Sequence, residues 1–339
     1  MNEPASHTCR PTANGELTLE GTWVTKLAII SVDVRALTMA PFGNNRVRAI
    51  WALVVAGILW GTSDVTTKAA LESIPPITLA TLRFCVAGLI LIPLARRSGL
   101  PALLNPRLAA LGLFGVAGAF LFQNAGLSRT SAGNASMLQG AAPVLIIVGA
   151  AFFLGEALGK TRVVGSAIAV IGLGALTLTS RDGMSAPGLG DLCILGSALC
   201  FALFVILGRS LFRQYGTIPV LAGATIWALV ALIPLASIEL IIHGVGPVSP
   251  GTAGLVLYLG IGCSALTYVL WGYALTHLEA SHAAVFDNMI PVVGVIAATI
   301  ILRERPTHLE VFGGVLIVCG AWIASRPSIT EMRHAFEST

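Results

Sequence analysis

From Ala49 onward the chain alternates between long apolar stretches and short polar breaks. Each apolar stretch is close to the length of about 20 residues at which a helix crosses the hydrocarbon core of a bilayer. The pattern therefore predicts an all-α membrane protein with ten transmembrane helices. The predicted spans are 49–69, 77–95, 107–127, 131–154, 162–180, 190–211, 217–241, 252–275, 280–302 and 308–325.

Composition supports a membrane protein. Hydrophobic residues make up 55% of the chain, charged residues make up 11%, and the mean hydropathy is +0.86. A soluble globular protein carries about 25% charged residues, so this chain has too few to cover a surface that faces water. The net charge is +4, and no dense cluster of Lys and Arg is interleaved with aromatic residues. Nucleic acid is therefore not a predicted partner.

The two ends of the chain are polar. Residues 1–48 hold one short apolar run at 27–32, which is too short to span a bilayer. Acidic residues precede this run, which argues against a signal peptide. Met39 lies ten residues before the first long apolar stretch and is an alternative start of translation, which would exclude residues 1–38. Residues 326–339 are predicted to form a cytoplasmic tail.

Basic residues predict the orientation of the spans. With the N-terminus placed inside, the cytoplasmic segments hold eleven Lys and Arg residues and the outer loops hold five. Because Lys and Arg favour the cytoplasmic side, both termini are predicted to be cytoplasmic. The protein is predicted to lie in the inner membrane and to cross it many times.

Motifs for metal or nucleotide chemistry are weak. None of the six cysteines forms a close pair of the kind that binds zinc. Residues 155–161 are similar to a P-loop but are one residue short, and no strand precedes them. His277, Glu279 and His282 are too few ligands for a convincing metal site. No cofactor, no metal and no enzymatic activity are predicted.

The sequence contains an internal repeat. Leu-Ile-Pro-Leu-Ala occurs at 91–95 and again at 232–236, an offset of 141 residues. A second series of matches has an offset of 148 residues. Its members include Gly112 with Gly260, Ala132 with Ala280, Pro143 with Pro291, Gly165 with Gly313 and Gly172 with Gly320.

The repeat predicts two copies of a five-helix unit, at 49–180 and 190–325. Internal repeats can decide a fold. Because five is an odd number, the second copy must cross the membrane in the opposite sense to the first. Inverted repeats of this kind occur in secondary transporters, with the solute site near the midplane between them.

These residues carry a resemblance to a known family. The segments 131–178 and 279–325 each resemble an EamA domain, and Trp60-Gly61 also fits. The features are Pro143, Leu154-Gly155-Glu156, Gly165 and Gly172 in the first copy, with Arg303-Glu304 in place of Gly155-Glu156 in the second. The resemblance is to EamA-type transporters of the drug/metabolite transporter superfamily. It implies an exporter of amino acids or related small metabolites.

Charged residues inside the spans are the first functional candidates, because charge is costly in lipid. Asp64 lies four residues before Lys68, so it either forms a local ion pair or binds a cationic group of the solute or a proton. Asp287 has no partner in its own helix and is the favoured proton carrier, with a hydrogen bond to a neighbouring helix as the alternative. Arg83 either holds a solute carboxylate, snorkels outward or pairs with Asp64.

Polar residues without charge add to this set. Gln123, Gln139 and Asn288 lie in predicted spans. Gln139 and Asp287 match at the offset of 148, and each lies four residues before a helix proline. This match indicates a shared cavity, with hydrogen bonds between helices as the alternative.

Prolines, aromatic residues and one acidic pair complete the predictions. Pro143 and Pro291 are candidate hinges or static kinks, because proline frees a backbone carbonyl. Trp60 and Trp271 are candidates for contact with the solute in an aromatic-walled site. The glycines that recur in the last span of each copy are expected to pack helices together. Glu156 and Glu304, at the ends of spans, are expected to be structural caps.

The favoured function is secondary transport by alternating access about a midplane cavity. The predicted partners are a small-molecule solute, the lipid bilayer and protons as the coupling ion; the oligomeric state is not predicted. A sensory or channel-like membrane module is the alternative. An intramembrane enzyme is the least favoured, because paired carboxylates, a Ser/His set and HExxH are all absent from the spans.

Overall fold

A computed structural model of the chain is helical throughout the part that it describes, which confirms the predicted all-α class. The chain divides into two units, 1–48 and 49–339, and the description below concerns the second unit. The extension before residue 45 and the tail after residue 324 lie outside the described part. The structure describes residues 45–96, 105–154, 159–179, 188–244, 246, 248–275, 277 and 289–324.

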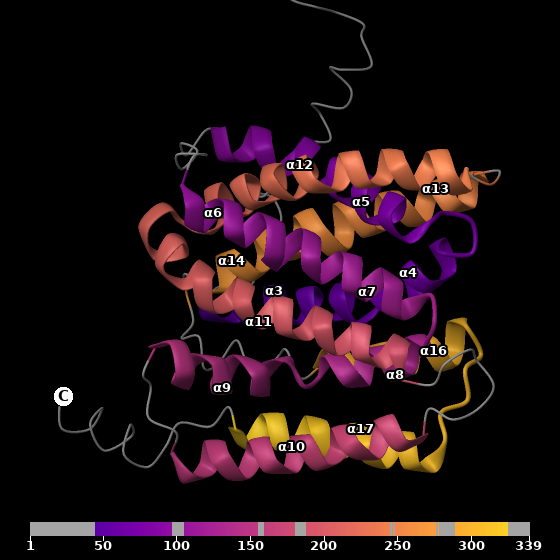
Figure 1. Ribbon diagram of the computed structural model, residues 1–339. Helices are drawn as coiled ribbons and strands as arrows, with labels where there is room; N and C mark the ends of the chain where they lie inside the picture. The colour runs from indigo at the N-terminus through magenta and orange to yellow at the C-terminus, as the bar shows by residue number, and fades with distance from the viewer. Residues whose placement is uncertain are drawn as a thin grey trace, which may run out of the picture. The chain divides into compact units, whose positions relative to one another are not determined.

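Helices carry the labels shown in Figure 1. Elements that follow one another directly, such as α6, η1 and α7, form one continuous run. The elements are α3 (Asn45–Gly61), α4 (Ser63–Ala70), α5 (Pro76–Arg96), α6 (Pro106–Ala110), η1 (Leu111–Gly118), α7 (Ala119–Leu127), α8 (Ala132–Gln139), α9 (Ala142–Leu154), α10 (Lys160–Thr179), α11 (Leu189–Tyr215), α12 (Thr217–His243), α13 (Pro250–Leu257), η2 (Tyr258–Leu266), α14 (Thr267–Leu275), α16 (Met289–Ile301) and α17 (His308–Ala324).

Within the described residues, seven helical runs are long and apolar enough to cross a membrane. They coincide with the first, second, third, fourth, sixth, seventh and eighth predicted spans. Three shorter apolar helices lie within the other predicted spans, at Val163–Ala175, Met289–Ile301 and His308–Ala324. The chain is therefore a multi-pass membrane protein, and the count of ten spans stays a prediction.

Local sequence explains where several helices begin and end. The side chains of Asn105, Ser131 and Ser249 each accept a backbone N–H of the first turn that follows, which caps α6, α8 and α13. Gly216 and Gly244 end α11 and α12 with positive φ values of 81° and 67°. Glycine adopts this conformation without a steric cost, so both helices can end sharply.

Two helix pairs bring distant parts of the sequence together. In Figure 1, α10 and α17 lie side by side along the lower edge, and α5 lies against α12 near the upper edge. A Cβ atom at Gly172 would lie 2.6 Å from the carbonyl oxygen of Gly313, and one at Gly320 would lie 2.6 Å from that of Gly165. The expected packing role of these glycines is confirmed, because only glycine permits such close backbone approach.

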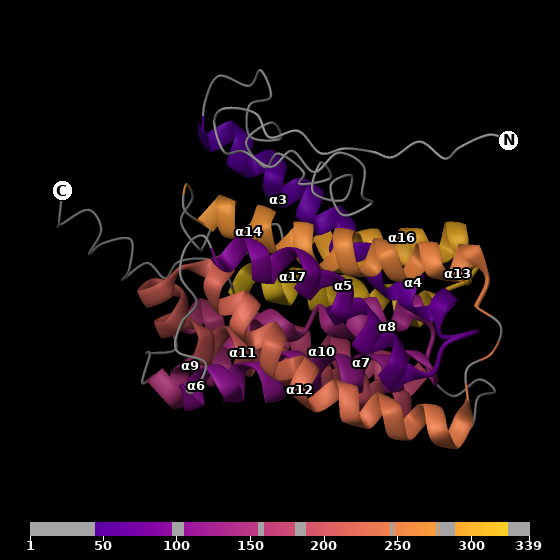
Figure 2. The same ribbon diagram turned by 90° about the horizontal axis from the view of Figure 1, so that it is seen from above.

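Figure 2, seen from above, shows how the bundle is layered. The run of α13, η2 and α14 lies along one side, and α12 lies along the opposite side. Between them, α5 packs on both, through η2 and through α12. Residues of α5 are therefore held in the interior of the described bundle.

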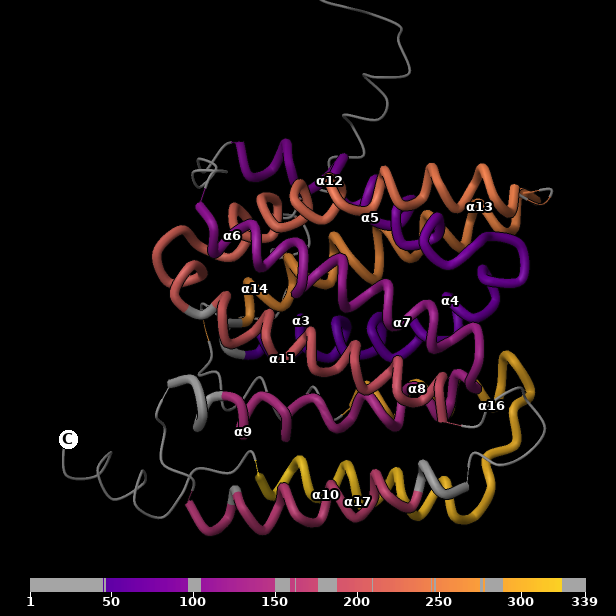
Figure 3. The backbone as a smooth tube through the Cα atoms, in the orientation of Figure 1, coloured from indigo at the N-terminus to yellow at the C-terminus, as the bar shows by residue number. Residues whose placement is uncertain are grey.

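Several runs depart from regular α-helix. The first run breaks at Thr62, between α3 and α4, and the fourth breaks at Gly140 and Ala141, between α8 and α9. Figure 3 shows α8 and α9 following one another along one line. Pro143 has no N–H to donate to the carbonyl of Gln139, which explains the second break. The π-helical segments η1 and η2 lie in the runs that match the third and the eighth predicted spans.

Candidate functional site

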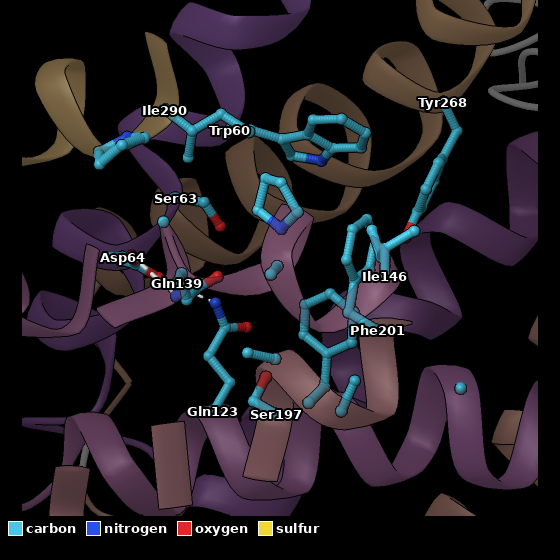
Figure 4. Close-up of a pocket in the computed structure, with 18 of the residues that line it drawn as sticks. Trp60, Ser63, Asp64, Gln123, Gln139, Ile146, Ser197, Phe201, Tyr268 and Ile290 are labelled. Atoms are coloured by element: carbon cyan, nitrogen blue, oxygen red, sulfur yellow. Dashed lines mark hydrogen bonds between the residues drawn. The ribbon is translucent and has the colours of Figure 1, made fainter. Parts of the chain in front are cut away.

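A cavity of about 120 Å³ lies inside the bundle where the broken helices meet. Asp64, Gln123 and Gln139 point toward one another in Figure 4, and they come from α4, α7 and α8. The predicted site residues that line the cavity are Trp60, Asp64, Arg83, Gln123, Gln139, Pro143 and Pro291. Most of the remaining lining is apolar or aromatic, from Phe120, Ile146, Phe201, Tyr268 and Ile290.

Asp64 is the centre of the polar part of the cavity. Its side chain exposes 2% of its surface. Oδ1 accepts hydrogen bonds from Gln123 Nε2 at 2.8 Å and Gln139 Nε2 at 3.0 Å, and Oδ2 accepts from Ser136 Oγ at 2.7 Å and Gln139 Nε2 at 3.0 Å. Four donor contacts fill the acceptor positions of a carboxylate. Asp64 therefore holds α7 and α8 against α4.

The break beside Asp64 has a local cause as well. The Thr62 hydroxyl donates to the carbonyl oxygens of Ile58 and Leu59, each at 3.1 Å. A Cβ atom at Gly61 would lie 2.6 Å from Cβ of Val293 on α16. The glycine admits α16 against the end of α3, and the hydroxyl bonds to carbonyls of the preceding turn.

Arg83 is buried on α5, with 2% of its surface exposed. Its Nε donates to Ser264 Oγ at 2.7 Å, Nη1 donates to Ser63 Oγ at 3.1 Å, and Nη2 donates to the carbonyl of Cys263 at 3.4 Å. Its guanidinium carbon lies 4.4 Å from the centre of the Phe120 ring, a favourable cation–π distance. Arg83 therefore lies at the cavity and does not snorkel outward.

The alternative ion pair between Asp64 and Lys68 does not form. Lys68 Nζ donates to the carbonyl oxygens of Leu127 and Thr130, both at 2.7 Å. These carbonyls lie at the C-terminal end of α7, where backbone acceptors lack helix partners and a cation is favoured by the helix dipole. The lysine is thus used to hold α4 against the end of α7.

Two further carboxylates cap helix starts. Glu304 accepts the N–H groups of Ala132 and Gly133 at 2.9 Å and 2.8 Å, so the expected cap is confirmed. It joins the segment after α16 to the first turn of α8. Glu239 on α12 accepts the backbone N–H groups of Ile77 and Thr78 at 3.1 Å and 2.7 Å at the start of α5. Glu156, the other expected cap, lies outside the described residues.

The two predicted tryptophans, Trp60 and Trp271, lie in different parts of the structure. Trp60 lines the cavity, donates Nε1–H to the carbonyl of Cys263 at 3.1 Å and meets the Tyr268 ring edge-on at 5.6 Å. Trp271 is absent from the cavity lining and packs against the cluster that contains Ala49 and Leu53. Trp271 therefore lies away from the cavity.

Some predictions lie outside the described residues, and some contacts were not predicted. Asp287 and Asn288, and hence the match of Asp287 with Gln139, fall in an undescribed segment. Ser136 was missed, although it lies three residues before Gln139 and therefore shares its helix face. Nothing in the sequence marked Ser63 and Ser264 as partners of Arg83, because single serines are common in apolar helices.

A helical bundle of long apolar runs around a small cavity with buried charges defines a multi-pass membrane protein suited to moving small solutes. The model of the EamA-like transporter family matches residues 47–178 and 188–326. The chain therefore belongs to the EamA-like transporter family, within the drug/metabolite transporters, as the sequence resemblance indicated.

Three relatives are described as transport proteins. A probable amino-acid metabolite efflux pump of Escherichia coli is 31% identical, over 82% of this chain and 95% of the relative. An uncharacterized transporter of Archaeoglobus fulgidus is 30% identical, over 81% and 97%. A probable terminal-alkyne amino-acid exporter of Streptantibioticus cattleyicolor is 28% identical, over 85% and 97%. A solved crystal structure shares the fold, with a TM-score of 0.59 at 21% identity over 84% of this chain and 98% of that chain.

Proposed function

We propose that this protein exports amino acids or related small metabolites across the cytoplasmic membrane by alternating access. The solute would bind in the cavity at Asp64, between two inverted five-helix repeats at 49–180 and 190–325. Both termini would be cytoplasmic. The observation that carries the proposal is the buried Asp64 carboxylate, held by donors from α7 and α8 in a cavity where two helices break.

Contacts between helices support the two repeats. A Cβ atom at Gly112 would lie 2.5 Å from Cβ of Trp227, and one at Gly260 would lie 2.5 Å from Cβ of Val86. Gly112 and Gly260 match at the offset of 148, and Val86 and Trp227 match at the offset of 141. Therefore η1 meets α12 as η2 meets α5, which is expected if two copies of one unit pack about an axis.

The irregular segments support the same relation. The offset of 148 carries η1 onto residues 259–266, which is η2 within one residue at its start. Proline lies inside both α5 and α12, at Pro93 and Pro234, within the repeated Leu-Ile-Pro-Leu-Ala sequence. π-Helical segments often occur at functional sites, and residues of η1 and η2 lie at the cavity or bind Arg83.

The helix breaks support the conformational change that alternating access requires. At the break between α8 and α9, Gly140 and Ala141 donate to carbonyls three residues earlier, so α8 can reorient relative to α9 without breaking a long helix. Hinges are commonly a few residues at the ends of elements. Pro143 lies directly after this break, as its predicted hinge role requires. Pro291 lies in the first described turn of α16.

The amino-acid class is supported by the relatives and by the size of the cavity. Two of the relatives above are described as carriers of amino acids or amino-acid metabolites. The cavity volume of about 120 Å³ is below the range of about 300–1,000 Å³ that is typical of pockets for drug-sized ligands. A small metabolite fits this space better than a large drug.

Proton coupling is part of the proposal. Asp287 is the predicted carrier from the sequence. Asp64 is the second candidate proton carrier, because its carboxylate lies in the cavity and its side chain exposes 2% of its surface. A proton or a cationic solute group at either position would neutralise a charge that is costly to bury.

The test is solute uptake into inside-out vesicles, with a labelled panel of amino acids and small metabolites, with and without an imposed pH gradient. Uptake of one class, raised by the gradient, is the expected result. Asp287→Asn and Asp64→Asn then identify the coupling carboxylate, with Asp191→Asn as the control, because Asp191 is equally buried but lies outside the cavity. No uptake of any compound would contradict the proposal and favour a sensory or channel-like module.

A further inference from the structure

We infer that the cavity binds its solute as an intact zwitterion, with an α-ammonium group on Asp64 and an α-carboxylate group on Arg83. Gln139 would give up its two contacts with Asp64 when the solute binds. This inference rests on the proposed export function and deepens it, because it names the two groups that a substrate must carry.

The contacts of Asp64 identify the donor that can be replaced. Gln123 and Ser136 each contact one carboxylate oxygen, at 2.8 Å and 2.7 Å, whereas Gln139 shares one amide nitrogen between both oxygens at 3.0 Å. Gln139 is also the last residue of α8, beside the break at Gly140. An ammonium group makes stronger hydrogen bonds to a carboxylate than a neutral amide does, so it would compete for the position of the Gln139 nitrogen.

The contacts of Arg83 leave capacity for an anion. Its three hydrogen bonds go to uncharged acceptors on Ser63, Ser264 and Cys263. A guanidinium carries five N–H donors, so two remain beyond these bonds. Its planar fork matches the geometry of a carboxylate. A solute carboxylate would therefore bind without displacing any of the three contacts.

The two charged groups belong to the same cavity and are linked through Ser63. Arg83 Nη1 bonds to the hydroxyl of Ser63, which directly precedes Asp64 in the chain. Both charged side chains line the cavity, and each exposes 2% of its surface. A solute with a positive and a negative group on neighbouring atoms can reach both, and each charge of the pair is then compensated in a medium of low dielectric constant.

The rest of the lining restricts the solute side chain. Trp60, Phe120, Phe201 and Tyr268 present aromatic surface, and Ile146 adds an aliphatic group. The cavity volume of about 120 Å³ is below the range of about 300–1,000 Å³ that is typical of pockets for drug-sized ligands. The side chain of the solute should therefore be small and apolar.

The first experiment measures which groups of the solute are recognised. Inside-out vesicles take up labelled L-valine, with labelled L-alanine and L-leucine in parallel. Four unlabelled compounds are tested as competitors of labelled L-valine. They are L-valine itself, L-valinamide, which lacks the carboxylate, N-acetyl-L-valine, which lacks the ammonium group, and isobutylamine, which also lacks the carboxylate. Loss of one charge-assisted contact should weaken each analogue by about 10- to 100-fold relative to L-valine.

Variants assign each group to its residue. Asp64→Asn should lose the preference for L-valine over N-acetyl-L-valine and keep the preference over L-valinamide. Arg83→Gln should do the reverse. Asp191→Asn removes an equally buried carboxylate, which binds Thr130 and Asn134 away from the cavity. This control should keep both preferences, whatever its rate of uptake.

The outcomes separate the inference from the proposed function. If all analogues compete as well as L-valine, the inference fails while amino-acid export stands. If the vesicles take up a metabolite that lacks these charges and none of the three amino acids, the inference also fails while an exporter stands. Should the variants not fold, the analogue series on the unaltered protein still decides. No uptake of any compound in the broader panel would overturn the proposed function itself.

Discussion

Replacing Gly172 with alanine should force α10 away from α17. A Cβ atom at this position would lie 2.6 Å from the carbonyl oxygen of Gly313 and 2.8 Å from the amide nitrogen of Ile317. Both are backbone atoms, so neither can move aside by changing a rotamer. Overpacking of this kind costs about 1–3 kcal/mol. The helix pair would have to separate or bend to admit one methyl group.

Gly174 supplies a matched control on the same helix. A Cβ atom there would meet nothing within 4 Å. Both substitutions gain about 1 kcal/mol from the better helix propensity of alanine, so this gain cancels when the two variants are compared. Gly172→Ala should therefore be about 1–3 kcal/mol less stable than Gly174→Ala.

The assay measures thermal unfolding of the purified protein in detergent. Samples are heated to a series of temperatures, and size-exclusion chromatography measures how much folded protein remains. At about 2–4 °C for each kcal/mol, the melting temperature of Gly172→Ala should be about 2–12 °C below that of Gly174→Ala. Equal melting temperatures would refute the packing of α10 on α17 through Gly172. A fall in both variants would show instead that the whole helix tolerates no added methyl group.

Substitutions at three further residues test other contacts. Glu304→Ala removes the cap of α8 and should lower stability by about 1–2 kcal/mol, seen as a lower melting temperature; an unchanged value would argue against the cap. Glu239→Gln places an amide against the N-terminal N–H groups of α5 and should cost about 1–3 kcal/mol in the same assay, whereas Glu239→Asp should recover part of the loss. Trp60→Phe removes the hydrogen bond from the indole Nε1–H to the Cys263 carbonyl and should raise the KM for transport about 2- to 10-fold; a KM equal to that of the parent would place Trp60 outside the binding wall.

The buried charges and amides could be selected from the sequence, although their partners could not. Asp64, Gln123 and Gln139 are polar residues within apolar runs, and the cost of burying them in lipid makes them conspicuous. Their mutual contacts join positions that are 59 and 75 residues apart in the chain. Spacing within one helix indicated a pair of Asp64 with Lys68, but in the tertiary structure Lys68 donates to backbone carbonyls at the end of α7 instead.

The sequence by itself determined the helical class, the positions of the apolar runs and the repeat, because hydrophobic length and periodicity are local properties. It also indicated that glycines at seven-residue spacing would pack helices. Only the tertiary structure decided that Trp60 faces the cavity and Trp271 does not. It likewise decided that Arg83 meets Ser264 across 181 residues of chain. Such choices depend on how whole helices pack and rotate against one another, which no local pattern specifies.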